Sequence, residues 1–322
     1  MIITRTPFRV SFIGGGSDFR DFYAKNGYGA VVSAAINRYM YIIIHPYFHD
    51  KIRLKYSKTE DVENIEEIEH PIVRECLKKV QIERGIEIAS FADVPSGTGL
   101  GSSSSFAVGL LHALYTYKGK VVSKEKLARE ACEIEIDILG KPIGKQDQYA
   151  SAYGNINYIR FNRDETVDVS SILLTESAKK KLENNLCLYY IKGKRRSCDI
   201  LEEQKKNISI EDKFQNLKKM VMLADELKDN LHVEKIDDVG SILHKGWIYK
   251  KELASRISNS DVDNLYDKAL KCGAIGGKLL GAGGSGFLLI YSEDHEVLRK
   301  HMGCKVLSFS IDREGAKVIF YE

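Results

Sequence analysis

The chain has 322 residues, of which 43% are hydrophobic and 29% are charged, and its formal net charge at pH 7 is +3. This balance is typical of a soluble globular protein with a large core, and the length favours two domains. Because the net charge is small, we expect neither a nucleic-acid nor a membrane partner, and any anion binding has to be local.

Six cysteines are scattered along the chain, with no Cys-x-x-Cys pair and no zinc-like spacing. Such cysteines are typical of free thiols in a reducing compartment. The N-terminal stretch resembles a strand followed by glycines more than a signal peptide, and the longest apolar run, 40–48, is too short to cross a membrane. We therefore expect a cytoplasmic protein.

The first hundred residues are rich in short β-type runs, which predict strands at 2–13, 30–36, 40–48, 51–57 and 87–95. A helix is expected within 70–85. From Phe106 to Tyr117 apolar residues fall at helical spacing and predict a second helix. Ser123 is the expected N-cap of a third helix, which we predict to end at Gly140.

The second half begins with strands at 155–161 and 187–193 and is then mostly helical over 210–271. This mixture predicts an α+β protein with two lobes. The C-terminus returns to predicted strands at 286–291, 304–311 and 316–321. We place the boundary near 178–185, which gives an N-terminal lobe of residues 1–183 and a C-terminal lobe of residues 184–322.

The segment PSGTGLGSSSS, residues 95–105, has three alternating glycines, then four serines and a predicted helix. Glycines let backbone N–H groups point into one concavity, and the helix adds its unpaired N-terminal donors. The segment lacks the Lys-Ser/Thr pair of a Walker A loop, and a Gly/Ser turn before an ordinary helix is the alternative. We predict a nucleotide-phosphate cradle made of Gly97, Gly99, Leu100, Gly101, Ser102, Ser103 and Ser104.

Two carboxylates follow this segment. Glu135 shares a face of the predicted helix with Cys132 and Leu139, and a carboxylate among apolar neighbours is costly unless it binds a cation or a partner. Asp147 lies in the loop sequence GKQDQ with Lys145 beside it. A neighbouring cation can hold such a carboxylate ionised as a general base. A turn-former or helix cap is the alternative for Asp147.

A third polar segment, RVSFIGGGSDF, begins at Arg9 and contains Gly15, Gly16, Ser17 and Asp18. Its side chains can hydrogen-bond a polyol, while the glycines allow a close approach. The alternative is a plain strand–loop connection with an Asx-type turn at Asp18.

Near the C-terminus, GAGGSGFLLIY matches the letters of the dinucleotide fingerprint G-x-G-x-x-G. That fingerprint has to follow a strand and open a helix. Here an apolar run, 287–291, follows the glycines and predicts a strand. The sequence therefore argues against a dinucleotide-dependent oxidoreductase and favours a glycine turn.

Taken together and in this order, the segments resemble the motifs of the GHMP kinases, a family that includes galactokinase, homoserine kinase, mevalonate kinase and phosphomevalonate kinase. RTPFRVSFIGGGSDF is similar to the first family motif, PSGTGLGSSSS to the second and KLLGAGGSGFLLI to the third. The resemblance covers nearly the whole chain. It implies a two-lobed fold with the active site in the cleft between the lobes, and an enzyme that uses ATP and Mg²⁺.

The resemblance also implies roles for individual residues. Asp147 matches the catalytic base, and Arg9 matches the arginine beside the base and the transferring phosphoryl group. Glu135 matches the acidic Mg²⁺ ligand, and Ser102 or Ser103 supplies the hydroxyl ligand, which we assign to Ser103. The implied substrate-binding residues are Gly15, Gly16, Ser17 and Asp18 of the first motif and Gly283 and Gly284 of the third, which in the family closes on the active site.

The acceptor is implied by a departure from the galactokinases, which carry G-E-H-T-D where this chain has GGGSD. The chain looks closest to the D-glycero-D-manno-heptose 7-phosphate kinases, which phosphorylate the C1 hydroxyl in the bacterial GDP-heptose route. Arg196 in KGKRRS matches a family arginine suited to the 7-phosphate, although such a run is also typical of a solvated turn. A fucokinase-like or galactokinase-like enzyme and a non-catalytic paralogue are the alternatives, and a homodimer is compatible with the sequence.

Overall fold

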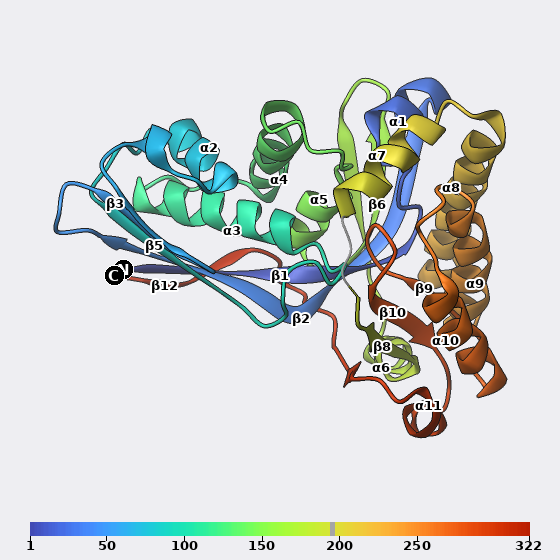
Figure 1. The fold of residues 1–322 in the computed structure, drawn as a ribbon. Coiled ribbons are helices and arrows are strands. Elements are labelled where there is room, and N and C mark those ends of the chain that lie inside the picture. Colours follow the sequence, from blue (N-terminus) through green and yellow to red (C-terminus); the bar gives the residue numbers. More distant parts are fainter. Residues whose placement is uncertain (194–196) are drawn as a thin grey trace.

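The computed structural model describes residues 1–193 and 197–322, and these form two β-sheets flanked by helices (Figure 1). Within these residues the larger sheet has eight strands and the smaller has four. The larger sheet contains β1 (Ile2–Ile13), β2 (Tyr28–Pro46), β3 (Ile52–Lys55), β4 (Thr59–Val62), β5 (Ile86–Ala92), β6 (Ile156–Asn162), β7 (Val167–Ile172) and β12 (Lys317–Tyr321).

The long strand β2 organises the larger sheet, whose order is β12-β1-β2-β5-β3-β4 with β6 and β7 as a branch. Strand β1 pairs antiparallel with most of β2. Along its other edge, β2 pairs with β6 from Tyr28 to Ala34 and with β5 from Met40 to Pro46. The two strands expected at 30–36 and 40–48 are therefore halves of one 19-residue strand, because β1 pairs with both of them across a register shift between Ile36 and Tyr39.

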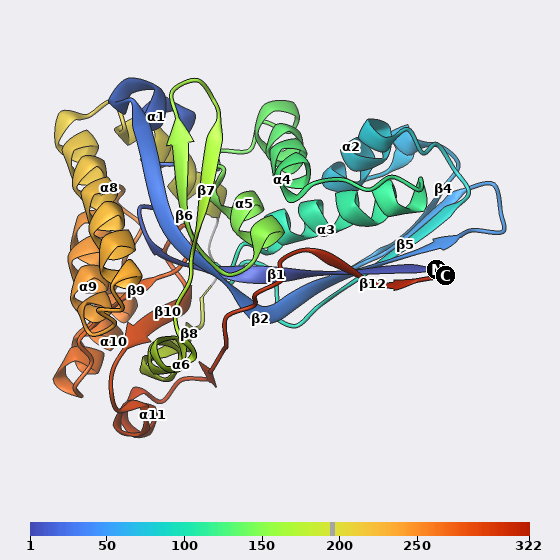
Figure 2. The same cartoon turned by 180° about the vertical axis from the view of Figure 1, so that it is seen from behind.

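The smaller sheet has the order β11-β8-β10-β9, and its pairs are antiparallel. The predicted strand at 304–311 is reduced to the two residues of β11. The final strand β12 returns to the larger sheet beside β1, so that the two termini lie next to each other in both views (Figures 1 and 2). The strands are β8 (Leu186–Ile191), β9 (Gly276–Leu279), β10 (Gly286–Tyr291) and β11 (Val306–Leu307).

Four helices cover one face of the larger sheet (Figure 1). They are α2 (Pro71–Val80), α3 (Ser102–Tyr117), α4 (Lys124–Cys132) and α5 (Gln146–Tyr153). Helix α3 is apolar on most sides because it packs against β1 and β2 below and against the three other helices. Ser123 caps α4 as predicted, since its side chain accepts a hydrogen bond from the N–H of Lys126.

The remaining helices lie around the smaller sheet and at one end of the larger sheet (Figure 2). The predicted α+β architecture with two lobes is confirmed by the two sheets and their helices. In residues 1–193 and 197–322, no helix has the length and apolar character needed to cross a membrane. These helices are α1 (Arg20–Asn26), α6 (Glu176–Asn185), α7 (Ser197–Asn207), α8 (Glu211–His232), α9 (Asp238–Lys251), α10 (Ser260–Lys271) and α11 (His295–Met302).

The helix predicted to run to Gly140 changes its geometry after α4. Residues Glu133–Ile138 form a π-helical turn, in which the N–H of Leu139 donates to the carbonyl of Ile134 at 3.0 Å. A π turn inserts an extra residue and is frequent at functional sites. Glu135 lies within this π turn and is fully buried. The sequence pattern indicated burial of this carboxylate but not the change of helix type.

The glycines of GAGGSG form the turn between β9 and β10, so the expected turn followed by a strand is confirmed. This turn packs against the segment 97–101, because the N–H of Phe287 donates to the carbonyl of Thr98 at 3.1 Å. A Cβ at Gly99 would lie 2.5 Å from the carbonyl oxygen of Leu280. The two glycine segments, almost 200 positions apart, are thus in direct backbone contact.

Gly286 tests this contact, since its φ is +113° and a Cβ there would lie 2.4 Å from the carbonyl oxygen of Thr98. We expect Gly286→Ala to lower the free energy of unfolding by more than the roughly 1–3 kcal/mol of backbone strain alone. Gly273→Ala is the matched control, because Gly273 has a φ of +96° and no atom within 4 Å of its Cβ position. Urea unfolding of the two variants measures the difference, and equal losses would show that the contact contributes nothing.

Candidate active site

A cavity of about 280 Å³ lies where the larger sheet meets α7, α9 and the β9–β10 turn. Gly281 and Ala282 line it from the turn. Three predicted motifs that are far apart in the sequence therefore share one cavity. The predicted residues in its lining are Arg9, Gly15, Gly16, Asp18, Gly97, Gly99, Gly101, Ser102, Ser103, Ser104, Glu135 and Asp147.

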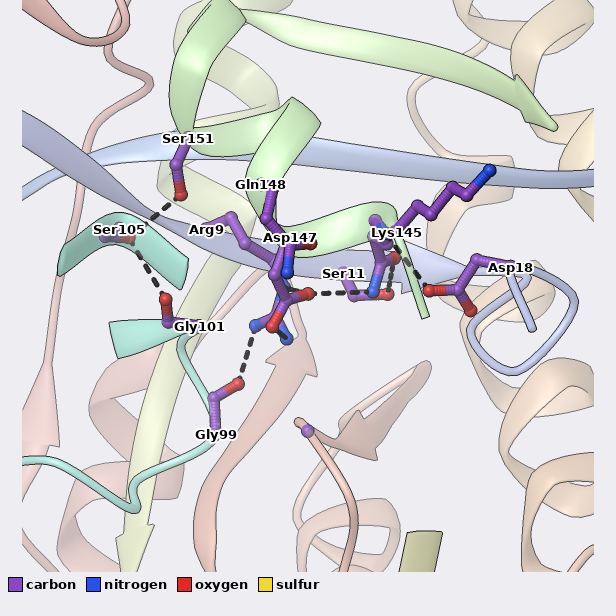
Figure 3. Close-up of polar contacts among 12 residues, drawn as sticks. Arg9, Ser11, Asp18, Gly99, Gly101, Ser105, Lys145, Asp147, Gln148 and Ser151 are labelled. Carbon is purple, nitrogen blue, oxygen red and sulfur yellow. Dashed lines mark hydrogen bonds and ion pairs between the residues drawn. The ribbon is translucent and has the colours of Figure 1, made fainter. Parts of the chain in front are cut away.

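A bidentate salt bridge between Arg9 and Asp147 lies at the centre of this site (Figure 3). Arg9 Nε donates to Asp147 Oδ1 at 2.7 Å and Nη2 donates to Oδ2 at 2.8 Å. Arg9 Nη1 donates to the carbonyl of Gly99 at 2.7 Å. The Arg9 side chain is 4% exposed and that of Asp147 is 26% exposed, so the carboxylate is accessible from the cavity while the guanidinium is enclosed.

The cation that pairs with Asp147 is Arg9, which the resemblance had placed beside the base. Lys145, the neighbour of Asp147 in the sequence and the other expected cation, does not pair with it. Lys145 points away from Asp147 (Figure 3), and its Nζ donates to Glu165 at 2.5 Å. The reason is that Lys145 is the N-cap of α5 and Asp147 is its second residue, and successive side chains leave a helix about 100° apart. Two positions apart in the sequence, these side chains therefore face different surroundings.

Asp18 is buried at the edge of the cavity and joins the first motif to α5. Its carboxylate accepts hydrogen bonds from the N–H of Gly16 at 2.8 Å and from the N–H of Gln146 at 3.1 Å. Burial raises the pKa of Asp18 above its ordinary value, although these two N–H groups act in the opposite direction. A Cβ at Gly144 would lie 2.0 Å from Asp18 Oδ2, so this position requires glycine.

The hydroxyl of Ser103 donates to Glu135 Oε1 at 2.5 Å, which brings together the two residues predicted to hold Mg²⁺. Gln148 Nε2 donates to the other oxygen of this fully buried carboxylate at 2.8 Å. Lys141 completes the cluster, since its Nζ lies 2.9 Å from both Ser103 Oγ and Glu135 Oε1. A cationic group thus contacts both oxygens, and hydroxyl and carboxylate oxygens are donors of the kind that Mg²⁺ prefers.

The predicted phosphate cradle has the expected backbone geometry. Gly97, Gly99 and Gly101 all have positive φ angles, and Gly101 precedes the first residue of α3. Within the described parts of the chain, no side chain caps this end of α3, so the N–H groups of its first turn stay available to an anion.

Positive charge also reaches the site from the second lobe. Lys250 of α9 lines the cavity, and its Nζ donates to the carbonyls of Gly281 at 2.6 Å and Leu279 at 3.3 Å. Lys278 lies behind this turn. Burial lowers the pKa of Lys278 well below its ordinary value, and the charges of Lys250 and Arg9 lower it further. Lys250 therefore brings positive charge to the end of the cavity beside the β9–β10 turn, whereas burial disfavours the charged form of Lys278.

Several residues that we predicted for the site do not line the cavity, as far as residues 1–193 and 197–322 define it. Leu100 is buried, and its carbonyl accepts from the N–H of Arg9 at 3.1 Å. The hydroxyl of Ser17 bonds to the backbone of Ala30. Gly283 and Gly284 face Ile257, since the N–H of Gly284 donates to the carbonyl of Ile257 at 2.9 Å. The predicted phosphate ligand Arg196 lies outside the described residues.

The sequence did not single out four polar residues that line the cavity, namely Lys141, Gln146, Gln204 and Lys250. Gln146 is held by the hydroxyl of Ser11, which donates to its Oε1 at 2.7 Å. One signal was available for Gln204, because it is a polar residue midway between Ile200 and Ile208 on one helical stripe.

Comparisons with known proteins agree with this geometry. Residues 68–155 match the GHMP kinases N terminal domain and residues 227–306 match the GHMP kinases C terminal domain, which together is more than half of the chain. A D-glycero-alpha-D-manno-heptose 7-phosphate kinase of Campylobacter jejuni is 29% identical over 98% of each chain. A galactokinase of Pyrococcus furiosus is 29% identical over 88% of this chain and 87% of its own.

Among solved structures, a D-glycero-D-manno-heptose 1-phosphate kinase from Bacteriodes thetaiotaomicron has a TM-score of 0.82 at 24% identity over the full length of both chains. This likeness shows a shared fold. With the domain matches, it establishes that the chain belongs to the GHMP kinase family, whose members are small-molecule kinases that use ATP.

Proposed function

We propose that this sugar kinase transfers the ATP γ-phosphoryl group to the C1 hydroxyl of D-glycero-D-manno-heptose 7-phosphate, giving the 1,7-bisphosphate. The observation that carries the proposal is the Arg9–Asp147 pair, whose carboxylate opens into the same cavity as the glycine and serine cradle. The full-length similarity to the Campylobacter jejuni heptose 7-phosphate kinase supports this acceptor. Arg196 remains our proposed ligand for the 7-phosphate.

In this proposal the chain aligns two substrates and balances charge, as phosphoryl transfer requires. The N–H groups at the start of α3 hold the nucleotide phosphates. Asp147 accepts the proton of the attacking hydroxyl, and Arg9 holds that carboxylate in place at the cavity. Asp18 holds the first motif against the residue that precedes the base, at the acceptor end of the cavity.

We assign Mg²⁺ to Ser103 and Glu135, because their oxygens lie together and a cationic group already contacts both of them. When bound, Mg²⁺ neutralises negative charge on the nucleotide phosphates. Gln148 keeps the second carboxylate oxygen of Glu135 occupied, which orients the first toward Ser103. We also propose that the lobes divide within α6 near residue 183, since β8 is the first strand of the smaller sheet.

A coupled ADP-release assay over mannose, fucose, galactose, heptose and heptose 7-phosphate tests the acceptor, with ³¹P NMR to locate the new phosphate. We expect turnover with heptose 7-phosphate and a doublet for an anomeric phosphate. Asp147→Asn is the matched variant, and its kcat should be at least about 10²-fold lower with ATP binding retained. Turnover of unphosphorylated sugars alone would overturn the acceptor, and an active Asn variant would overturn the base.

The metal assignment predicts competition between Lys141 and a divalent ion. We expect Lys141→Met to raise the affinity for Mn²⁺ without nucleotide by roughly 5-fold, since about 1 kcal/mol of competing ion pairing is removed. Electron paramagnetic resonance of free Mn²⁺ measures this affinity. The control is Lys79→Met, because Lys79 pairs with Glu133 in the same π turn. An equal rise in both variants, or none in Lys141→Met, would contradict the assignment.

A further inference from the structure

Helix α7 carries a buried glutamine, Gln204, at the wall of the cavity. The residue is 3% exposed, and its side chain lines the cavity beside the first motif. Among residues 1–193 and 197–322, its side-chain amide makes no hydrogen bond. Its polar atoms are not among the described side-chain atoms that are closed off from water without a partner, so the amide is open to the cavity and can bond a group that enters with the substrate.

The position of Gln204 is fixed by the helix that carries it. The neighbouring Glu203 accepts hydrogen bonds from the N–H of Ser255 at 2.7 Å and from its hydroxyl at 3.0 Å. Asn207 Nδ2 donates to the carbonyl of Leu253 at 2.8 Å. Helix α7 is therefore held in place on both sides of Gln204, by the hydrogen bonds of Glu203 and Asn207 to the segment that follows α9.

Gly16 shows where the amide lies. A Cβ at position 16 would be 2.1 Å from Gln204 Nε2, so any side chain there would collide with this amide. The sequence indicated that the glycines of the first motif leave room for the substrate. The space next to Gly16 is occupied by the side-chain amide of Gln204. This part of the cavity is therefore lined by a polar group from the second lobe.

We infer that Gln204 recognises a hydroxyl group of the acceptor and is a specificity-determining residue. A side-chain amide has both donors and an acceptor, which match a hydroxyl that also donates and accepts. A site built to bond a hydroxyl rejects an analogue that lacks it, because the buried polar group is then left unpaired. The inference rests on the proposed function in one respect, namely that the acceptor is a sugar.

The variant Gln204→Leu separates recognition from structure, since leucine has a similar size and no polar atoms. We expect the melting temperature of the substrate-free protein to stay about the same, because the amide makes no hydrogen bond among the described residues that leucine would lose. The KM for the acceptor should rise roughly 10-fold or more, while the KM for ATP stays unchanged. Glu202→Leu is the matched control at an exposed position of the same helix, and it should leave both constants unchanged.

A lower melting temperature together with an unchanged acceptor KM would show that Gln204 is structural and overturn the inference. Equal rises in both KM values would overturn it as well. The acceptor-induced rise in melting temperature gives a readout apart from turnover, and it should be smaller in Gln204→Leu than in wild type. If heptose 7-phosphate is not turned over but another sugar stabilises wild type more than the variant, the proposed acceptor fails and this inference stands. A wild type stabilised by no sugar contradicts the inference.

Discussion

The buried charge of Arg9 is the constraint on which the site depends. A guanidinium that is 4% exposed needs a counter-ion and partners for its other donors, because an uncompensated buried charge is strongly destabilising. Asp147 and the carbonyl of Gly99 supply them. The side chain of one strand residue thereby fixes the first turn of α5 and the glycine segment before α3. A Cβ at Gly101 would lie 3.1 Å from Asp147 Oδ2, which is closer than an ordinary contact.

A second constraint connects the lobes at the same place. The β9–β10 turn contacts the segment 97–101 through backbone atoms, and Lys250 holds the turn by two of its carbonyls. The cradle, the accessible carboxylate and Lys250 of the second lobe thus border one cavity. Its chemistry follows from this arrangement, since a negatively charged group entering it meets helix N–H donors and positive charge together.

Much of this arrangement could be predicted from the sequence, because it depends on local patterns. The strand at 2–13 and the helix up to Tyr117 follow from β-branched residues and helical spacing and were predicted correctly, although α3 begins at Ser102 and not at Phe106. The turn at 281–286 was distinguished from a dinucleotide fingerprint by the strand after it. These features are encoded within about fifteen residues, so no tertiary contact had to be known.

Other features depend on contacts that no short pattern records. The π turn at Glu133–Ile138 and the partner of Lys145 were missed, because each is decided by what packs against the chain. Lys141 and Gln204 come from segments without a motif and reach the cavity through the fold. The single strand β2 was divided into two for the same reason, since its continuity comes from β1.

A double-mutant cycle on Arg9 and Asp147, followed by urea unfolding, tests the central claim most directly. If Asp147 is the counter-ion of the buried Arg9, Asp147→Ala should cost about 3–5 kcal/mol. Combining it with Arg9→Met should then cost clearly less than the sum of the single changes, because the second substitution removes the unpaired charge. Free-energy losses that add within roughly 0.5 kcal/mol would contradict the account.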